Sequence, residues 1–277
     1  MTRAYAEVIG DPISHSKSPL IHGFWLEKLG IAADYRACHV PSQDLPAYLA
    51  SRRADPHWRG CNVTIPHKEA IGVLIDAPDA KALAIGAVNT VVPLPGGGLG
   101  GTNTDVDGVA DAVGDLRLDG RHAVVIGAGG AARAAFAFLA TRGCASVRVL
   151  ARTPDKARRA AADCGLAVDV FPFAAGTGAF AAATLVINAT QLGMTGQDAM
   201  PGFVLDELAL LAPGALVFDM VYAPLETALL AAARAQGART ADGLLMLVGQ
   251  AAVAFGRFFG QAAPRAFDAE LRERLTA

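Results

Sequence analysis

The chain has 277 residues, 53% of them hydrophobic and 18% charged, which excludes an intrinsically disordered protein and suffices for two domains of ordinary size. Its formal net charge of −2 excludes a global field that would attract nucleic acid or an anionic membrane, so an anionic ligand needs a local group of cations. No apolar run is long enough to span a bilayer, and the first residues read into a strand rather than a signal peptide.

The cysteines are scattered along the chain without a C-x-x-C pair or a metal-ligand spacing. This pattern favours reduced core residues over a disulfide set or a zinc site. We therefore expect a cytoplasmic protein with no bound metal and with no nucleic-acid or membrane partner. The cysteines are Cys38, Cys61, Cys144 and Cys164.

Short apolar segments alternate with segments of helical periodicity over almost the whole chain, a pattern typical of βα units and a mostly parallel sheet. A helix is expected from Pro19 to Leu29, with Ser18 as its N-cap and Gly30 at its end. The glycines after Pro95 predict a turn. The strands expected before this turn are Tyr5–Ile9, Tyr35–Val40, Gly60–Val63 and Val88–Pro93.

A second series of strands and helices begins after Gly120, and we place a domain boundary near Asp105–Val109. An alanine-rich helix is expected over Ala131–Arg142, another from Leu225, and a long apolar helix from Gly243. The sequence thus predicts two α/β domains, the second with a parallel sheet. The strands expected in this series are His122–Ile126, Ser146–Leu150, Ala167–Phe171, Leu185–Asn188 and Leu216–Asp219.

A glycine loop follows the strand His122–Ile126 and matches the G-x-G-x-x-[G/A] pattern of dinucleotide-binding sites. In that pattern the first glycine permits a tight turn, the second lets the backbone approach a pyrophosphate, and the next helix supplies N–H groups. A purely structural glycine turn is the alternative, and the strand-loop-helix-strand context favours the dinucleotide site. The loop residues are Gly127, Ala128, Gly129, Gly130, Ala131 and Ala132.

The end of the next strand indicates which dinucleotide is bound. NAD-specific sites usually carry an acidic residue there, but this strand ends in Leu150-Ala151-Arg152-Thr153. A guanidinium at Arg152 suits the 2′-phosphate of NADP, which a carboxylate would repel. A solvated basic helix face is the alternative interpretation of the other cations nearby. The basic residues of this segment are Arg148, Arg152, Lys156, Arg158 and Arg159, against one acidic residue, Asp155.

Several loops hold more hydroxyl and amide groups than a turn requires, and each follows a predicted strand. Ligands bind at this edge of a parallel sheet. These groups therefore predict a substrate that is rich in hydroxyls and that can carry one carboxylate. The loops cover residues 14–19, 62–68, 87–90 and 102–105.

Lys68 and Asp105 are the pair in these loops that offers a cation and an anion for proton transfer and its orientation. Reduction of a ketone needs a proton at the oxygen as hydride reaches the carbon, and a lysine beside a carboxylate can supply it. A surface lysine and a helix-capping aspartate are the alternative. His15 and His67 are interpreted as loop residues adjacent to the working side chains.

Taken together, these residues resemble the shikimate dehydrogenase family, and the resemblance covers nearly the whole chain in the expected order. It implies an NADP-dependent enzyme that reversibly reduces 3-dehydroshikimate to shikimate in aromatic amino-acid biosynthesis. The matching blocks begin with His15–Pro19, Asn62–Lys68, Ala87–Thr90, Asn103–Asp105, Gly127–Ala131 and Ala151–Thr153. They end with Asn188–Thr190, Asp219–Tyr222 and Asp242–Gln250.

The resemblance also implies a role for each matching residue. Lys68 would be the general acid/base, and Asp105 would orient both the lysine and the substrate. The substrate carboxylate would lie on Ser16 and Ser18, with Tyr222 near it. The residues implied for the ring hydroxyls are Thr64, Asn89, Asp105 and Gln250. Those implied for NADP are Gly127, Ala128, Gly129, Gly130, Ala131, Arg152, Thr153 and Lys156, with Gly243 and Met246 at the nicotinamide.

The family plan implies a substrate-binding domain of residues 1–105 and 241–277, a Rossmann-type NADP domain of residues 106–240, and an active site in the cleft between them. The protein is expected to be a monomer or a homodimer. The chain departs from the family pattern at Ala151, at His67 and over 190–194. His67 replaces a common phenylalanine and is expected to alter the proton affinity of Lys68.

Two alternatives remain open at this stage. One is a quinate/shikimate dehydrogenase with relaxed substrate choice or NAD use. The other is a catalytically silent protein that binds NADP or a shikimate-like ligand.

Overall fold

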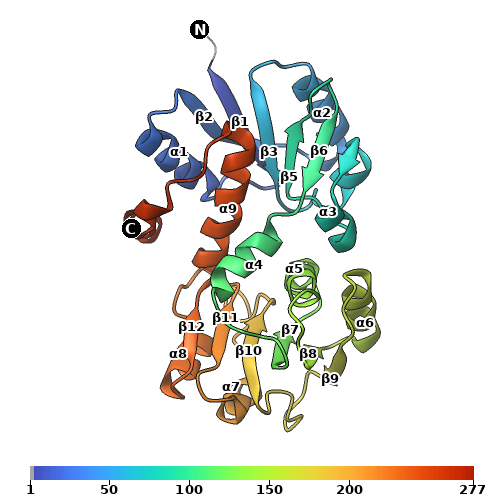
Figure 1. Ribbon diagram of the computed structural model, residues 1–277, viewed down its shortest axis with the longest axis vertical. Coiled ribbons are helices and arrows are strands. Elements are labelled where there is room, and N and C mark those ends of the chain that lie inside the picture. Colours follow the sequence, from blue (N-terminus) through green and yellow to red (C-terminus); the bar gives the residue numbers. More distant parts are fainter. Residues whose placement is uncertain (1–2) are drawn as a thin grey trace. The chain divides into compact units, whose positions relative to one another are not determined.

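The computed structural model describes residues 3–277, which form two compact units (Figure 1). The first unit takes in the chain up to Thr104 and again from Gln250 to Ala277, and the second runs from Asp105 to Gly249. The chain therefore passes between the units twice, and the second unit is an insertion in the first.

The first unit is built on a mixed six-stranded sheet with the order β2-β1-β3-β5-β6-β4. Its strands are β1 (Ala4–Gly10), β2 (Ala33–His39), β3 (Trp58–Val63), β4 (Ala77–Pro78), β5 (Thr90–Pro93) and β6 (Leu99–Thr102). Its helices are α1 (Ser18–Leu29), α2 (Leu45–Arg53), α3 (Ala80–Ile85) and α10 (Asp268–Thr276), with short 3₁₀ helices at Ser42–Asp44, Ala70–Val73 and Arg265–Phe267.

The prediction of a mostly parallel sheet is wrong for part of this unit, because β5 and β6 form an antiparallel hairpin. The turn between them is closed by a hydrogen bond from Leu94 N to Gly98 O of 2.7 Å. A connection this short cannot carry the crossover of a dozen or more residues that parallel neighbours need. β4 and β6 were not among the predicted strands, and Gly100 and Gly101 explain why β6 gives a weak strand signal.

Helix α1 ends as predicted, at Gly30 in the left-handed conformation (φ 63°), but it begins differently. Lys17 is the N-cap residue and makes no side-chain cap hydrogen bond, so the prediction that Ser18 caps the helix is wrong. Ser18 is instead the first helical residue and is buried.

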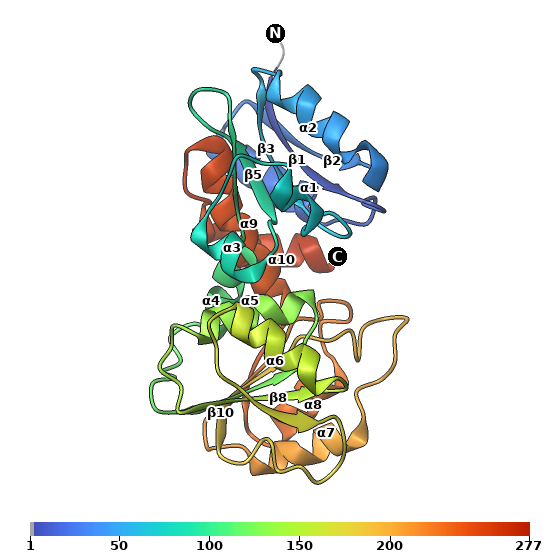
Figure 2. The ribbon, with the colours of Figure 1, turned by 90° about the vertical axis from the view of Figure 1, so that its right-hand side faces the viewer.

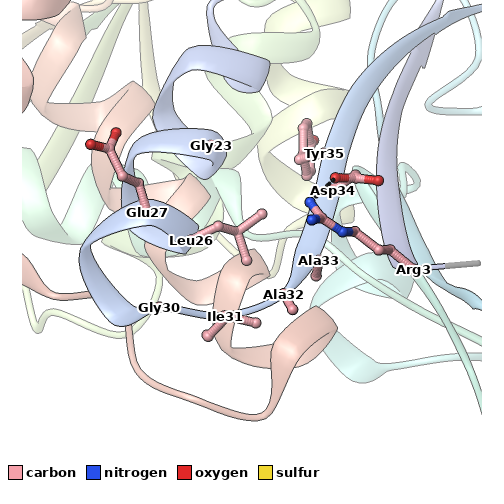
Figure 3. Close-up of a pocket in the computed structure, with 10 residues that line it drawn as sticks. All are labelled: Arg3, Gly23, Leu26, Glu27, Gly30, Ile31, Ala32, Ala33, Asp34 and Tyr35. Atoms are coloured by element: carbon pink, nitrogen blue, oxygen red, sulfur yellow. Dashed lines mark ion pairs between the residues drawn. The ribbon is translucent and has the colours of Figure 1, made fainter. Parts of the chain in front are cut away.

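An open depression lies between the end of α1 and the edge strand β2 (Figure 3). Across it Arg3 and Asp34 form an exposed ion pair of 3.7 Å. None of the residues predicted for the site lines it, so we do not assign it a functional role. Its lining residues are Arg3, Gly23, Leu26, Glu27, Gly30, Ile31, Ala32, Ala33, Asp34 and Tyr35.

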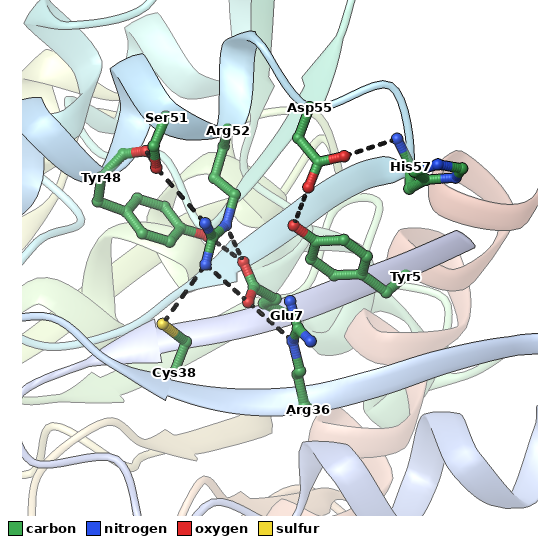
Figure 4. A network of polar contacts seen from close by, with 9 residues as sticks. All are labelled: Tyr5, Glu7, Arg36, Cys38, Tyr48, Ser51, Arg52, Asp55 and His57. Carbon is green, nitrogen blue, oxygen red and sulfur yellow. Dashed lines mark hydrogen bonds and ion pairs between the residues drawn. The ribbon is translucent and has the colours of Figure 1, made fainter. Parts of the chain in front are cut away.

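A buried carboxylate joins α2 to the sheet (Figure 4). Glu7 on β1 is 1% exposed and accepts two hydrogen bonds from Arg52 on α2, at 2.7 and 3.1 Å. Tyr48 Oη donates to it at 2.8 Å and Arg36 Nε at 3.1 Å. The hydrogen bond to Glu7 is the chief reason that the pKa of Arg52 is raised. The buried charge is therefore fully paired, as a charge in a protein interior must be.

The second unit has an all-parallel six-stranded sheet with the order β12-β11-β10-β7-β8-β9. Counted along the chain from β7 and read from β9, this is the 3-2-1-4-5-6 order of the dinucleotide-binding Rossmann fold. Its strands are β7 (His122–Ile126), β8 (Ser146–Ala151), β9 (Asp169–Pro172), β10 (Ala183–Asn188), β11 (Leu216–Asp219) and β12 (Arg239–Ala241).

Helices cover both faces of this sheet (Figures 1 and 2). One apolar core packs α4 (Asp105–Val113), α5 (Gly130–Leu139) and α6 (Pro154–Asp163) on one face. The other packs α7 (Gly202–Asp206) and α8 (Ala228–Ala235) on the opposite face, with a 3₁₀ turn at Glu207–Leu210. The predicted two-domain α/β architecture, with a parallel sheet in the second domain, is confirmed.

The second passage of the chain between the units occurs inside α9 (Gly243–Phe259), after Gly249. Residues 241–249 stay with the second unit because β12 pairs with β11 and Gly243 N donates to Val221 O at 3.1 Å. The predicted substrate domain includes residues 241–277. This range is a functional assignment and stays a prediction.

Candidate active site

The glycine loop lies at the switch point of the second sheet, between the neighbouring strands β7 and β10. Gly127 has φ 100°, and a Cβ there would lie 2.6 Å from Thr190 Cγ2, so the turn requires glycine. Gly129 and Gly130 differ, because a Cβ on either would meet no atom within 4 Å. The packing of the protein therefore does not explain these two glycines, whereas the close approach of a ligand at the N-terminus of α5 would.

The loop has the small, packed residue that its pattern predicts. Ala132 is fully buried in the core between α5 and the sheet, and Ala131 is exposed beside it. Ala128 is partly buried against the same core.

The basic segment begins with Arg148 inside β8 and continues past the end of that strand, whose residue Leu150 pairs with Ile126 at the end of β7. Arg152 and Thr153 therefore leave the sheet at the same edge as the glycine loop. Arg152, Thr153 and Lys156 are exposed, and within residues 3–277 none of them forms an ion pair. The other cations of the segment have different partners: Arg158 pairs with Asp155 at 2.9 Å, and Arg148 donates to two main-chain carbonyls.

A buried aspartate organises the other half of this edge. Asp219, at the end of β11, accepts hydrogen bonds from Asn188 Nδ2 (2.8 Å), Thr227 Oγ1 (2.7 Å) and Val221 N (3.0 Å). Burial raises its pKa, and these three hydrogen bonds oppose that effect. Sequence analysis gave Asp219 no role, although its place at a strand end before Tyr222 was a signal.

The loop that Asp219 holds carries the exposed Tyr222 and lies against the start of α9. A Cβ on Gly243 would come within 2.2 Å of Met220 O, so only glycine allows this approach. Met246, one turn further along α9, is partly buried against the core of the second unit. Gly243, Met246 and the glycine loop thus belong to one unit.

In the first unit, the loops after β1 and β3 are fastened to each other. Thr64 N donates to Ile9 O at 3.0 Å, and Asp11 N donates to Ile65 O at 3.1 Å. Ser16 Oγ accepts from Ser18 N at 3.3 Å, so the two serines lie together at the start of α1. These contacts bring the predicted carboxylate-binding serines and the segment of Lys68 to one edge of the sheet.

Lys68 is held at its main chain by a hydrogen bond from Val88 N to Lys68 O of 2.7 Å. The neighbouring His67 is buried, and its Nε2 donates to Val40 O at 2.7 Å. A carbonyl only accepts, so this nitrogen carries the proton. His67 therefore ties the loop of Lys68 to the end of β2; its expected effect on the proton affinity of Lys68 stays a prediction. His15 is exposed.

The remaining predicted substrate residues form a buried hydrogen-bonded group. Asn89 is 2% exposed and Gln250 9% exposed, and both contact Thr104, by Asn89 Nδ2 to Thr104 Oγ1 (3.0 Å) and Thr104 Oγ1 to Gln250 Oε1 (3.4 Å). Asp105 follows at once as the first residue of α4, in the second unit. Because Lys68 belongs to the first unit, the meeting of Lys68 with Asp105 stays a prediction.

Residues 3–277 contain no group of three or more histidines, cysteines or acids that could hold a metal ion. Within the same residues, no helix has the length and apolar character to cross a membrane.

Two family models match the chain. The first, described as the shikimate dehydrogenase substrate binding domain, matches residues 8–91. The second, described as shikimate / quinate 5-dehydrogenase, matches residues 109–194. Among curated relatives, the shikimate dehydrogenase (NADP(+)) of Sphingopyxis alaskensis is 51% identical over 273 residues, which cover 99% of this chain and 97% of the relative.

Solved structures also match nearly the whole chain. The shikimate 5-dehydrogenase of Thermus thermophilus, solved in complex with NADP(H) and shikimate, superposes with a TM-score of 0.83 at 35% identity, over 98% of this chain and 99% of that one. The ligand-free 5-ketofructose reductase of a Gluconobacter strain superposes with a TM-score of 0.88 at 27% identity, over 99% of each chain.

Proposed function

The chain belongs to the shikimate dehydrogenase family, and we propose that it catalyses the reversible reduction of 3-dehydroshikimate by NADPH to shikimate and NADP⁺ in aromatic amino-acid biosynthesis. The observation that carries this proposal is the loop of Lys68, which is fastened to the ends of β1, β2 and β5 at the edge that also holds Ser16, Ser18 and Asn89. Such fastening holds a reacting group in place.

The cofactor site is proposed in the second unit. Main-chain N–H groups of residues 127–131 at the N-terminus of α5 would bind the pyrophosphate, where Gly129 and Gly130 leave open space. Arg152, with Thr153 and Lys156, would bind the 2′-phosphate, since these exposed side chains lie at the same edge. The nicotinamide would lie against Gly243 and Met246.

The substrate site is proposed to consist of the residues that the family resemblance implies. Ser16 and Ser18 would bind the carboxylate with Tyr222 beside it, and Thr64, Asn89, Asp105 and Gln250 would bind the ring hydroxyls. Residues 1–105 and 241–277 would then form the substrate domain, and residues 106–240 the NADP domain. We further propose a cytoplasmic enzyme that is a monomer or a homodimer.

When bound, NADPH supplies the hydride that reaches the carbonyl carbon of the substrate. In the proposed mechanism, Lys68 Nζ donates a proton to the carbonyl oxygen as negative charge develops there, so that the ketone becomes a secondary alcohol. Asp105 orients the ammonium and the hydroxyl being formed. In the reverse direction neutral Lys68 takes the proton from the alcohol.

Spectrophotometry at 340 nm tests the reaction, with shikimate and quinate as substrates and with NADP⁺ and NAD⁺ side by side. We expect oxidation of shikimate with NADP⁺ to be the fastest combination. Thermal stabilisation by these ligands without any change in absorbance would indicate the catalytically silent binding protein instead.

The variant Lys68→Met tests the proton donor. We expect its kcat to fall by ~10²–10⁴, the usual contribution of a general acid/base, while NADPH still binds. Lys81→Met, on α3 of the same unit, is the control and should keep its kcat. A Lys68→Met enzyme with more than half of the wild-type kcat would refute the assignment.

A further inference from the structure

We propose that Tyr35 and Thr90, joined through Asn62, are positioning residues that fix the amide of Asn89 for binding the substrate. The three residues continue the hydrogen-bonded group of Asn89, Thr104 and Gln250, and we name all six the asparagine network. The inference rests on the proposed function, because it concerns the same substrate site.

The network begins at a buried phenol. Tyr35 on β2 donates from Oη to Asn62 Oδ1 at 2.6 Å. Burial is the main reason that the pKa of Tyr35 lies well above its usual value of 10, and a hydrogen bond with the Ser18 side chain lowers it. The phenol therefore remains a neutral donor at any pH at which the enzyme works, and it adjoins a serine proposed to bind the carboxylate.

The ring of Tyr35 is held by stacking. His22 on α1 lies parallel to it, with ring centroids 3.9 Å apart and an interplanar angle of 3°. The ring of Phe258 on α9 lies tilted beside it, with ring centroids 6.2 Å apart. A ring packed in this way has one direction for its hydroxyl, so the bond to Asn62 is fixed by packing as well as by hydrogen bonding.

The middle of the network crosses from β3 to β5, where Asn62 and Thr90 are partners in the strand pairing. Asn62 Nδ2 donates to Thr90 Oγ1 at 3.0 Å, and Thr90 Oγ1 donates to Asn89 Oδ1 at 2.9 Å. The direction of each bond follows from the one before it: because Asn62 Oδ1 accepts from the phenol, its amide nitrogen must face Thr90.

The last step fixes Asn89. Its Oδ1 accepts from Thr90 Oγ1 and also from Thr104 N, at 2.7 Å, so its carbonyl is turned toward these two donors. The amide nitrogen must then be on the other side of the planar group. Without Tyr35 and Thr90 the carbonyl is still held by Thr104 N, but less firmly, so the amide is freer to rotate away from the orientation that presents its donors at the proposed hydroxyl site.

Removal of the phenol oxygen tests the network. Tyr35→Phe keeps the ring that stacks on His22 and leaves a buried amide oxygen without this donor. We expect the KM for shikimate to rise about tenfold, the effect of one buried hydrogen bond, with the KM for NADP⁺ unchanged and kcat reduced less than threefold. Tyr48→Phe is the matched control, since it removes a buried phenol of the same unit that bonds Glu7 and lies outside the network.

Thr90 gives a second test that does not depend on the first variant. Thr90→Val should raise the KM for shikimate as Tyr35→Phe does, whereas Thr90→Ser should restore it. In the double variant the two effects should combine to less than their product, because Tyr35 and Asn62 reach Asn89 through Thr90.

The outcomes separate the network from the function. An active wild-type enzyme whose Tyr35→Phe variant keeps its KM within twofold would overturn the network alone. Equal increases in Tyr48→Phe, or a Thr90→Ser variant no better than Thr90→Val, would do the same. A wild-type protein that does not oxidise shikimate would overturn the proposed function, and the inference with it.

Discussion

Arg152 shows how a single residue can indicate a cofactor. It leaves the sheet at the edge of the glycine loop and, unlike Arg148 and Arg158, has no protein contact that accounts for its charge. A guanidinium is always charged and matches a phosphate in geometry.

The first prediction concerns this side chain. Arg152→Ala should weaken NADP⁺ binding by about 1.5–3 kcal/mol, as for a hydrogen bond to a charged group, and leave NAD⁺ binding nearly unchanged. Titration calorimetry or fluorescence with each dinucleotide measures both. Arg159→Ala, on the exposed face of α6, is the control and should change neither. Equal losses for the two cofactors would contradict the assignment to the 2′-phosphate.

At the scale of residues, the sequence could predict the role of a residue where that role depends on its neighbours in the sequence. Gly127 has a positive φ and no room for a Cβ, and the G-x-G-x-x-[G/A] motif predicts a tight turn that needs glycine there. Ser18 was wrongly predicted as an N-cap: the cap is Lys17, and the Ser18 side chain hydrogen-bonds Tyr35, a partner that no local pattern indicates. Asp219 and its partners Asn188 and Thr227 come from three segments, which no local pattern connects.

At the scale of elements, α2 is attached to the sheet by an apolar face and by a buried ion pair. Its buried face offers Leu45, Tyr48 and Leu49, and the contact is completed by Arg52 on Glu7. Removal of one member of a buried ion pair leaves the other unpaired and usually costs several kcal/mol.

Glu7→Gln should therefore destabilise the first unit by about 3 kcal/mol, at the low end for buried pairs because Arg52 and Arg36 are 22% and 53% exposed. Both tryptophans, Trp25 and Trp58, belong to this unit, so their fluorescence in urea reports on its unfolding. The exposed pair of Asp34 with Arg3 in the same unit provides a control: Asp34→Asn should change stability by less than about 0.5 kcal/mol. Similar effects of the two substitutions would show that α2 does not depend on the buried charge.

The elements of the second sheet were easier to predict than those of the first. Strands such as His122–Ile126 and Leu216–Asp219 are continuous apolar runs, as buried parallel strands are, and were predicted at their observed bounds. The short strands β4, β6 and β12 depend on their neighbours for pairing and carry little apolar signal of their own.

At the scale of the whole molecule, acid should affect the first unit through His22. This side chain is fully buried among Trp25, Tyr35 and Phe255, and within residues 3–277 neither ring nitrogen has a hydrogen-bond partner. Burial lowers its pKa from 6.5 to about 3. The unfolded chain takes up a proton as the pH falls below 6.5, whereas the folded chain does so only near pH 3.

The contribution of neutral His22 to stability is thus complete above pH 6.5 and is lost as the pH falls toward 3, by about 1.4 kcal/mol per pH unit. Between pH 6.5 and 4.5 the wild-type first unit should lose about 2 kcal/mol more than His22→Phe, which cannot titrate. The substitution also has a cost of repacking that does not depend on pH. This cost cancels when the difference in free energy of unfolding between the two proteins is compared from one pH to another. Tryptophan fluorescence in urea measures the free energy of unfolding. If it changed with pH in the same way in both proteins, the effect of His22 would be ruled out.

The order of the strands was beyond sequence analysis. Alternating strands and helices predict a parallel sheet, but neighbours such as β7 and β10 are brought together by packing over more than fifty residues. The mixed order of the first sheet arises in the same way, from pairings between distant segments.

The interrupted first unit has a consequence for the newly made chain. Its early strands and α1 leave the ribosome long before α9, which brings Phe255 and Phe258 to the aromatic cluster around His22. The inserted unit is continuous and can close its own sheet in the meantime. During synthesis, the half that emerges first is therefore the half that must wait to complete its interior.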